Sequence, residues 1–343
     1  MKTFIKKYWL FILLATLASA LTVIFFLNRG QEEIQKDLLS IPYPGIESVS
    51  SLTSPNIENL KNKFSAFEKK LNVYEVQESS FSDQEALNIA LNFGFSQPPT
   101  VTDFIYNWAT EFNNLSVYLK EGIVGYGLNL LDHPELISGP PPTIKEAENQ
   151  GKEFLKKEEF LIPQDIELQV DEQYYAKVEG SYFEPSKQDD IKTTLVYIKF
   201  IYLLNDKKIK GSGSDFISFY IGSDFKITRF DYNKIFKNIN LLNSYPLKNE
   251  DEVLSSIKAN PKISYLKNQD KYSDEYLPIK ETVNNLKSLS FENIELIYYK
   301  QNSSQSYLQP VFLITGTAQL KNDEVVEVGL YLPAIKDEYL LTP

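Results

Sequence analysis

The chain has 343 residues, a formal net charge of -11 and no cysteine. The negative charge repels phosphate backbones and so excludes nucleic acid as an expected partner, while the missing cysteines exclude disulfides, thiolate catalysis and zinc–sulfur sites. Because hydrophobic residues make up 43% of the chain, a large core is expected and global disorder is not.

The N-terminal stretch Tyr8–Leu27 is apolar and carries no charged residue. As a helix it would be roughly 30 Å long, which matches the hydrocarbon core of a bilayer. Lysines precede this stretch and acidic residues follow it, at positions 2, 6, 7 and 32, 33, 37. This distribution predicts a signal anchor: a single-pass protein of the cell membrane, with the lipid bilayer as a partner, a cytoplasmic N-terminus and an extracytoplasmic C-terminal domain.

The alternative for this stretch is a cleaved signal peptide, because Ala18-Ser19-Ala20 has the form of a cleavage site. The length of the apolar run favours a retained anchor. We therefore expect a cytoplasmic tip and anchor over residues 1–29. A tether rich in Pro, Ser and Gly is expected over residues 30–58.

Three helix starts follow, each with a capping residue three positions before a glutamate. They begin at Ser82, Thr143 and Asn249, and apolar residues at helical spacing come after each. Runs of β-branched and aromatic residues separated by turn residues come behind each helix and predict antiparallel meanders. The strands expected are Thr102–Thr110, Leu115–Leu119, Ile123–Leu131, Ile166–Val178, Thr193–Leu204, Lys208–Ile221, Phe225–Asp231, Ile294–Lys300, Leu308–Leu320 and Val325–Leu332.

This order predicts an α+β fold in which an N-terminal transmembrane helix is followed by repeated helix-plus-antiparallel-meander units. The units expected are residues 59–137, 138–247 and 248–343. Gly139-Pro140-Pro141-Pro142 separates the first from the second, and the break near Pro246 separates the second from the third. Residues 268–290 have no clear pattern beyond a short helix from Ile279 to Leu286.

A capped helix with Glu-Ala followed by a meander resembles the PepSY-type domains of bacterial exported proteins. The wider layout is similar to the YycH/YycI group of membrane-anchored regulators of sensor kinases. The residues that carry the resemblance are Ser82–Ala86, Thr143–Glu148 and Tyr307–Phe312. It implies a non-enzymatic, regulatory module that binds or inhibits another protein, and the second unit is the PepSY-like one.

Residues that could carry chemistry have more ordinary explanations. His133 is the single histidine of the chain and lies in Asp-His-Pro, so we expect a surface or capping role. The Ser-x-x-Lys matches Ser255–Lys258 and Ser264–Lys267 lack the Lys-Thr-Gly partner of penicillin-binding enzymes. The tandem segments Gly213–Phe216 and Gly222–Phe225 resemble oxygen-ligand loops for Ca²⁺, but Gly-Ser-Asp is ordinary turn chemistry.

Aromatic pairs could line a groove for a peptide or a glycan, although such residues in strands are more often in the core. The candidates are Tyr106 with Trp108, Tyr174-Tyr175 and Tyr298-Tyr299. Asn114 and Asn302 begin glycosylation sequons, which are short enough to arise by chance.

No set of residues identifies a reaction, so we expect no catalytic, cofactor-binding or metal-binding residues and no enzyme activity. The hypothesis is a membrane-anchored exported module that acts by contact with a membrane or envelope protein. The alternative is an envelope-exposed hydrolase that uses two carboxylates on a cell-wall glycan or peptide.

Overall fold

The computed structural model describes residues 38–77, 80–157, 160, 162–180, 182–211, 216–268, 276–300 and 306–341. The chain forms two compact units. The smaller unit comprises Met1–Tyr43 and Asp337–Pro343, and the larger one Pro44–Lys336. In the smaller unit β1 (Ile41–Pro42) pairs in parallel with β20 (Leu340–Leu341), which follows a 3-10 helix at Asp337–Tyr339.

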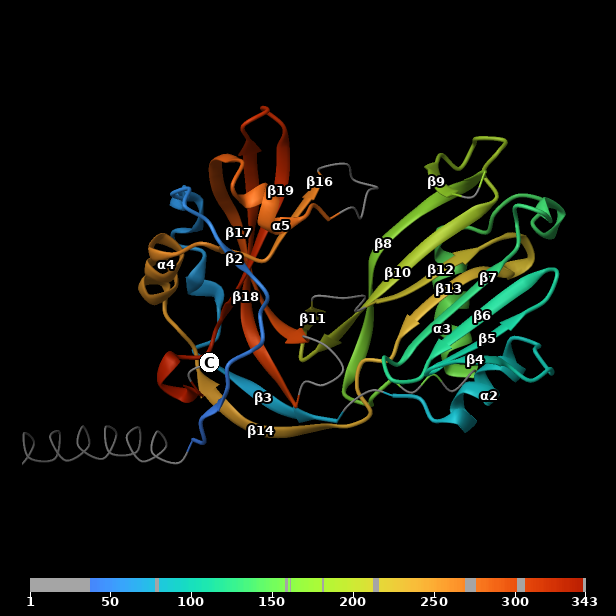
Figure 1. Ribbon diagram of the computed structural model, residues 1–343, viewed down its shortest axis with the longest axis horizontal. Coiled ribbons are helices and arrows are strands. Elements are labelled where there is room, and N and C mark those ends of the chain that lie inside the picture. The colour runs from blue at the N-terminus through green and yellow to red at the C-terminus, as the bar shows by residue number, and fades with distance from the viewer. Residues whose placement is uncertain are drawn as a thin grey trace, which may run out of the picture. The chain divides into compact units, whose positions relative to one another are not determined.

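The larger unit is built on strands (Figure 1). Among its described residues, sixteen strands form one sheet, which has two halves that share a border at β10 and β11. The nine-strand half has the order β9-β8-β10-β12-β13-β7-β6-β5-β4, and every neighbouring pair in it is antiparallel. Its strands are β4 (Thr100–Thr102), β5 (Ile105–Ala109), β6 (Asn113–Tyr118), β7 (Ile123–Leu128), β8 (Ile166–Glu179), β9 (Tyr182–Ser186), β10 (Leu195–Leu204), β12 (Phe216–Ile221) and β13 (Ile227–Asn233).

Two helices cover one face of the nine-strand half. They are α2 (Asp83–Asn92) and α3 (Ile144–Lys157), and their small and apolar side chains share a core with the aromatic side chains of β10, β12 and β13. Gly151 of α3 lies against Phe200 and Phe219, because a Cβ there would be 3.2 Å from either ring. This close approach explains a glycine inside a helix, where it costs about 1 kcal/mol relative to alanine.

The seven-strand half has the order β14-β3-β18-β17-β11, with β19 beside β18 and β16 beside β19. Its strands are β3 (Lys70–Val76), β11 (Lys207–Gly211), β14 (Ile239–Pro246), β16 (Tyr265–Asn268), β17 (Leu286–Lys300), β18 (Tyr307–Leu320) and β19 (Val325–Pro333). β18 is buried along almost all of its length, which fits its apolar sequence and central place. The remaining elements are β2 (Val49–Ser50) paired with β15 (Lys262–Ile263), the helices α4 (Glu250–Ala259) and α5 (Ile279–Val283), and 3-10 turns at Glu58–Leu60, Phe64–Ala66, Pro134–Leu136 and Ser223–Phe225.

The predicted fold class is wrong, although the helix starts it used are right. Capping boxes at Ser82 and Asn249 open α2 and α4, and Thr143 exchanges the same two hydrogen bonds with Glu146 before α3. However, the chain is mostly strand with few helices, and the strands do not form repeated helix-plus-meander units. β3 pairs with β14 and β18, β7 pairs with β13, and β11 pairs in parallel with β17, so strands from all three expected units share one sheet. Caps act locally, whereas strand pairing depends on burial between distant segments.

The predicted single-pass membrane localisation, with its transmembrane helix and signal anchor, is also contradicted. No helix in the part of the chain that the structure describes is long and apolar enough to cross a membrane. The stretch Tyr8–Leu27 on which that prediction relied lies outside the described residues, and the lipid bilayer as a partner stays a prediction.

We expect Phe230→Ala to lower the free energy of unfolding by about 3–5 kcal/mol, because it removes a large buried ring. Phe230 is 0% exposed and packs against the rings of Phe154, Phe160 and Phe219. Phe104→Ala is the matched control, since Phe104 is 49% exposed and its main contact is with the Lys120 ammonium. The control should cost about 1 kcal/mol or less in urea unfolding, and equal losses would contradict the assigned core.

A buried lysine connects α2 to the end of β13. The Lys234 ammonium is 2.9 Å from a Glu85 carboxylate oxygen and 3.1 Å from the Ser80 carbonyl oxygen. Partial burial raises the pKa of Glu85, but hydrogen bonds from Ser82 and Lys234 outweigh burial, so the pKa is below its ordinary value. The same carboxylate therefore caps a helix and neutralises a buried cation.

This pair predicts a pH-dependent stability. Because the pKa of Glu85 is lower in the folded chain than in the unfolded one, its contribution is present above about pH 4.5 and is lost as the pH falls through the folded value. The difference in unfolding free energy between wild type and Glu85→Gln should therefore shrink between pH 7 and pH 3. The control Glu153→Gln removes an exposed carboxylate of α3 and is measured at the same pH values. A pH-independent difference for Glu85→Gln would refute the assignment.

Candidate functional site

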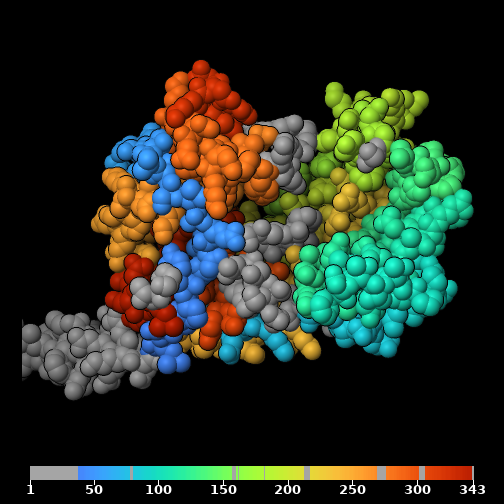
Figure 2. Space-filling view, in the orientation of Figure 1, coloured from blue at the N-terminus to red at the C-terminus, as the bar shows by residue number. Residues whose placement is uncertain are grey.

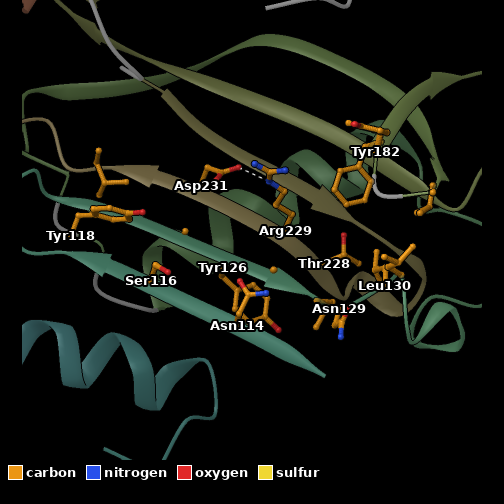
Figure 3. A pocket seen from close by; sticks show the side chains of 18 residues that line it. Asn114, Ser116, Tyr118, Tyr126, Asn129, Leu130, Tyr182, Thr228, Arg229 and Asp231 are labelled. Carbon is orange, nitrogen blue, oxygen red and sulfur yellow. Dashed lines mark hydrogen bonds and ion pairs between the residues drawn. The ribbon is translucent and has the colours of Figure 1, made fainter. Parts of the chain in front are cut away.

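The face of the nine-strand half that is opposite α2 and α3 carries a groove of about 630 Å³. We call it the β7 groove, because β7 forms its floor. It is lined by Asn114, Ser116, Tyr118, Ile123, Gly125, Tyr126, Gly127, Leu128, Asn129, Leu130, Leu131, Val178, Gly180, Tyr182, Phe183, Thr228, Arg229 and Asp231 (Figure 3). The volume is in the range of ordinary ligand sites.

Alternation along each strand explains why this face is polar. In β6, β7 and β13 the side chains of Leu115, Val124 and Phe230 point into the core. Their sequence neighbours must then point to the opposite face, because successive side chains of a strand alternate. The cross-strand register arranges these neighbours in two adjacent rows. One row is Asn107, Ser116, Gly125, Asp231, Ser218, Lys199 and Glu172, and the other is Asn114, Gly127, Arg229, Tyr220, Tyr197 and Tyr174.

Glycines interrupt both rows at β7. Gly127 lies between Asn114 and Arg229, and Gly125 lies between Ser116 and Asp231. Because neighbouring strands are about 4.8 Å apart, the backbones of β6 and β13 are about 10 Å apart. At Gly125 and Gly127 no side chain of β7 stands between them. The floor of the groove is thus bare backbone at Gly125 and Gly127, while Ile123, at the start of β7, also lines the groove.

No protein atom requires these two glycines. A Cβ on Gly125 would have its nearest neighbour at 4.0 Å, and one on Gly127 at 3.7 Å. In contrast, a Cβ on Gly316 or Gly329 would be 1.9 Å from an atom of Ser290 or Tyr265. Glycine weakens a strand, and inside one it often marks a place where a ligand or another backbone approaches closely. The β7 glycines therefore point to a ligand, whereas Gly316 and Gly329 are explained by packing.

The hairpin of β8 and β9 forms one wall of the groove. Phe183 of β9 stacks on Tyr220 of β12, with ring centroids 4.2 Å apart, although β8 and β10 lie between these strands. The hairpin must therefore bend over the open face. Its tip carries Tyr182, which is 73% exposed and lines the groove together with Arg229 (Figure 3). The space-filling view places this hairpin, in yellow-green, beside the cyan and green surface of the strands β4 to β7 (Figure 2).

An ordered chain of hydrogen bonds holds the charged side chains of the groove. Asp231 accepts a hydrogen bond from Arg229 Nε at 3.0 Å and another from Ser218 Oγ at 3.3 Å. Beside them, burial raises the pKa of Tyr174 and of Tyr220, whose hydroxyls are 3.3 Å apart, so both stay neutral at physiological pH. Among the residues that line the groove, Arg229 and Asp231 are the ones with charged side chains.

The remaining polar side chains of the groove present amides and hydroxyls. Ser116 Oγ donates to Asn107 Oδ1 at 2.7 Å, and Asn129 Nδ2 donates to Asp132 at 2.8 Å. Such groups can hydrogen-bond a ligand but do not transfer protons near neutral pH. No group of three His, Cys, Asp or Glu side chains able to hold a metal ion occurs in the described residues.

The residues singled out in the sequence do not converge on this groove. His133 begins the turn at Pro134, contacts the Phe112 ring and lies 3.0 Å from Glu135. Ser255 and Lys258 lie on α4. Ser264 and Lys267 lie at β16, where Ser264 Oγ accepts a hydrogen bond from the Tyr331 backbone N–H.

The two Gly-Ser-Asp segments have different outcomes. Gly222–Phe225 is a turn between β12 and β13, with positive φ at Asp224 and Phe225, as turn chemistry predicts. Gly213–Asp215 lies outside the described residues, and so does Asn302 with its sequon.

Most of the aromatic candidates are in the core. Trp108, Tyr298 and Tyr299 are buried, and Trp108 Nε1 donates to the Gln97 carbonyl oxygen at 3.0 Å. Tyr174 belongs to the open-face row. Of the residues named from the sequence, Asn114 lines the groove. Reasoning from the sequence missed the two glycines of β7, Arg229 and Tyr182. The glycines could have been found from Gly125-Tyr126-Gly127, which places two glycines on the same face of a predicted strand.

No family model matches the chain, and no curated protein matches it. The structure has a likeness to the crystal structure at 1.45 Å of an uncharacterized protein from Eubacterium rectale ATCC 33656. The two share 12% sequence identity over 81% of this chain and 86% of that one, with a TM-score of 0.40. Such a score transfers neither fold nor function.

The glycines of the sheet give a direct test of the site. We expect Gly125→Ala and Gly127→Ala to change the free energy of unfolding by less than about 1 kcal/mol or to raise it, because a Cβ fits and alanine restricts the unfolded chain. Gly316→Ala and Gly329→Ala, the matched controls, should each cost about 1–3 kcal/mol through overpacking. Urea unfolding of the four variants measures this. Large losses at Gly125 and Gly127 would mean that packing requires them too.

Proposed function

We propose that the chain is a non-catalytic binding module that acts through contact with another protein, a segment of which lies in the β7 groove. The carrying observation is the strip between β6 and β13, whose backbones are about 10 Å apart, where Gly125 and Gly127 present no side chain. One extended chain would lie over this strip, with its side chains against Asn114 and Ser116 on one side and Arg229 on the other.

The chemistry of the lining supports binding rather than catalysis. Carboxylate-dependent glycoside hydrolysis needs two carboxyl groups, about 5–9.5 Å apart, on either side of the scissile bond. The groove lining contains Asp231 and no other carboxylate, and Asp231 is engaged by Arg229 and Ser218. We therefore do not propose the hydrolase as the function of this groove.

A regulatory role agrees with this proposal. The resemblance to PepSY-type domains and to the YycH/YycI group implies a module that binds or inhibits another protein. We propose the same kind of action here, in which occupancy of the groove changes the activity of the partner.

The test is crosslinking in the native host from inside the groove. A photo-crosslinking amino acid in place of Tyr182 should give a discrete protein adduct, because this side chain is 73% exposed at the groove. The same amino acid in place of Leu241, which is 61% exposed on β14, is the control and should not give that adduct. In a variant that combines this amino acid at position 182 with Gly127→Leu, the leucine side chain covers the floor of the groove. The adduct should then be abolished.

The proposal is wrong if position 182 gives no protein adduct, or if Gly127→Leu leaves the adduct unchanged while the variant stays folded. An identical adduct from position 241 would also count against the groove as the contact surface.

A further inference from the structure

The single guanidinium among the described residues lies in the β7 groove. The chain has two arginines, Arg29 and Arg229, among 35 basic residues, and Arg29 lies outside the described residues. Lysine is thus the default cation of this chain. An arginine differs from lysine in its planar fork of donors, which binds a carboxylate through two parallel hydrogen bonds.

The fork of Arg229 is held in a defined orientation. Its Nε donates to Asp231, and Ser218 on the neighbouring strand fixes that carboxylate. The terminal nitrogens make no hydrogen bond to the described residues, and the side chain is 50% exposed. Figure 3 shows the guanidinium beside Asp231, and Tyr182 of the hairpin wall lines the same groove. The arginine therefore keeps two outward donors ready for a ligand.

The opposite wall places no acidic group against such a ligand. Across the bare floor from Arg229 lies Asn114, whose amide can both donate and accept. The Asn114 amide can pair with the backbone of an extended chain, while Arg229 takes a side chain from it. The Asn129 amide nitrogen is engaged by Glu111 and Asp132, which leaves its oxygen as an acceptor.

We propose that the partner segment carries an aspartate or glutamate whose carboxylate pairs with the terminal nitrogens of Arg229. This inference rests on the proposed function and adds the chemistry that the groove selects. The floor along β7 accommodates the extended backbone, and the guanidinium supplies the charge-assisted contact that fixes its register.

A saccharide chain fits the groove less well. Saccharides bind over exposed aromatic ring faces, and Phe183 already stacks on Tyr220. Tyr126, which also lines the groove, stacks on Phe93 with centroids 4.3 Å apart. Tyr182 is the one lining tyrosine or phenylalanine that is largely exposed, so a continuous aromatic platform does not form.

The experiment selects peptides from a random heptapeptide display library on the full-length chain. Wild type is compared with Arg229→Gln, with Arg229→Lys, which keeps the charge but loses the fork, and with Lys226→Gln. The last is a charge-matched control at an exposed residue just before β13. A chain with a net charge of -11 disfavours acidic peptides in general, so their enrichment would report a specific contact.

We expect the peptides selected by wild type to share one acidic position. Replacing that residue by its amide, or Arg229 by Gln, should weaken binding by about tenfold or more, and the two changes together should weaken it no further. Arg229→Lys should restore only part of the affinity, and Lys226→Gln should leave it unchanged.

Two results would overturn the inference in distinguishable ways. Peptides that lose binding in Gly127→Leu but show no acidic position would refute the carboxylate and leave the proposed function intact. If no peptide competes for the groove, or if a glycan array gives Gly127-dependent binding instead, both the inference and the proposed function fail.

Discussion

The larger unit depends on the change of partner along one edge of β10. Residues Val196–Ile201 of β10 pair with β12, and then Leu203 and Leu204 pair with β11. The turn Asn205-Asp206, with positive φ at both residues, sends β11 back along β10 and into parallel pairing with β17. Without this turn the two halves of the sheet would share no hydrogen bonds at this border.

Buried polar contacts surround that border. Asn205 donates to the hydroxyl of Tyr74, whose ring packs edge-on against Tyr298, and Tyr298 in turn donates to the Asn72 carbonyl oxygen. Burial raises the pKa of Tyr298, so its hydroxyl stays a neutral donor. Such networks are costly when one partner is lost, because the others are then buried without hydrogen bonds. The border is thus specified by polar groups as well as by the apolar packing of Ile209.

Features that depend on neighbouring residues could be predicted from the sequence, whereas features that depend on contacts between distant segments could not. Capping boxes and turn residues are local, and the starts of α2 and α4 and the turns at Asn205-Asp206 and Gly222–Phe225 agree with them. Strand pairing is not local, so the pairing of β7 with β13 and of β11 with β17 could not be read from spacing. The groove has the same origin. Gly125 and Gly127, like Gly316 and Gly329, lie inside predicted strands, and the neighbouring strands decide which glycines are covered.

The function proposed for the open face rests on the same distinction. A half-sheet needs one covered face for stability, and α2 and α3 with the core between them supply it. The other face carries two adjacent rows of side chains, and both rows are interrupted by the bare backbone of Gly125 and Gly127. Arg229 is the member of these rows that solubility does not explain, because the chain uses lysine for that purpose almost everywhere else. An arginine oriented by Asp231 and Ser218 beside an unfilled floor is the arrangement that a bound carboxylate would complete.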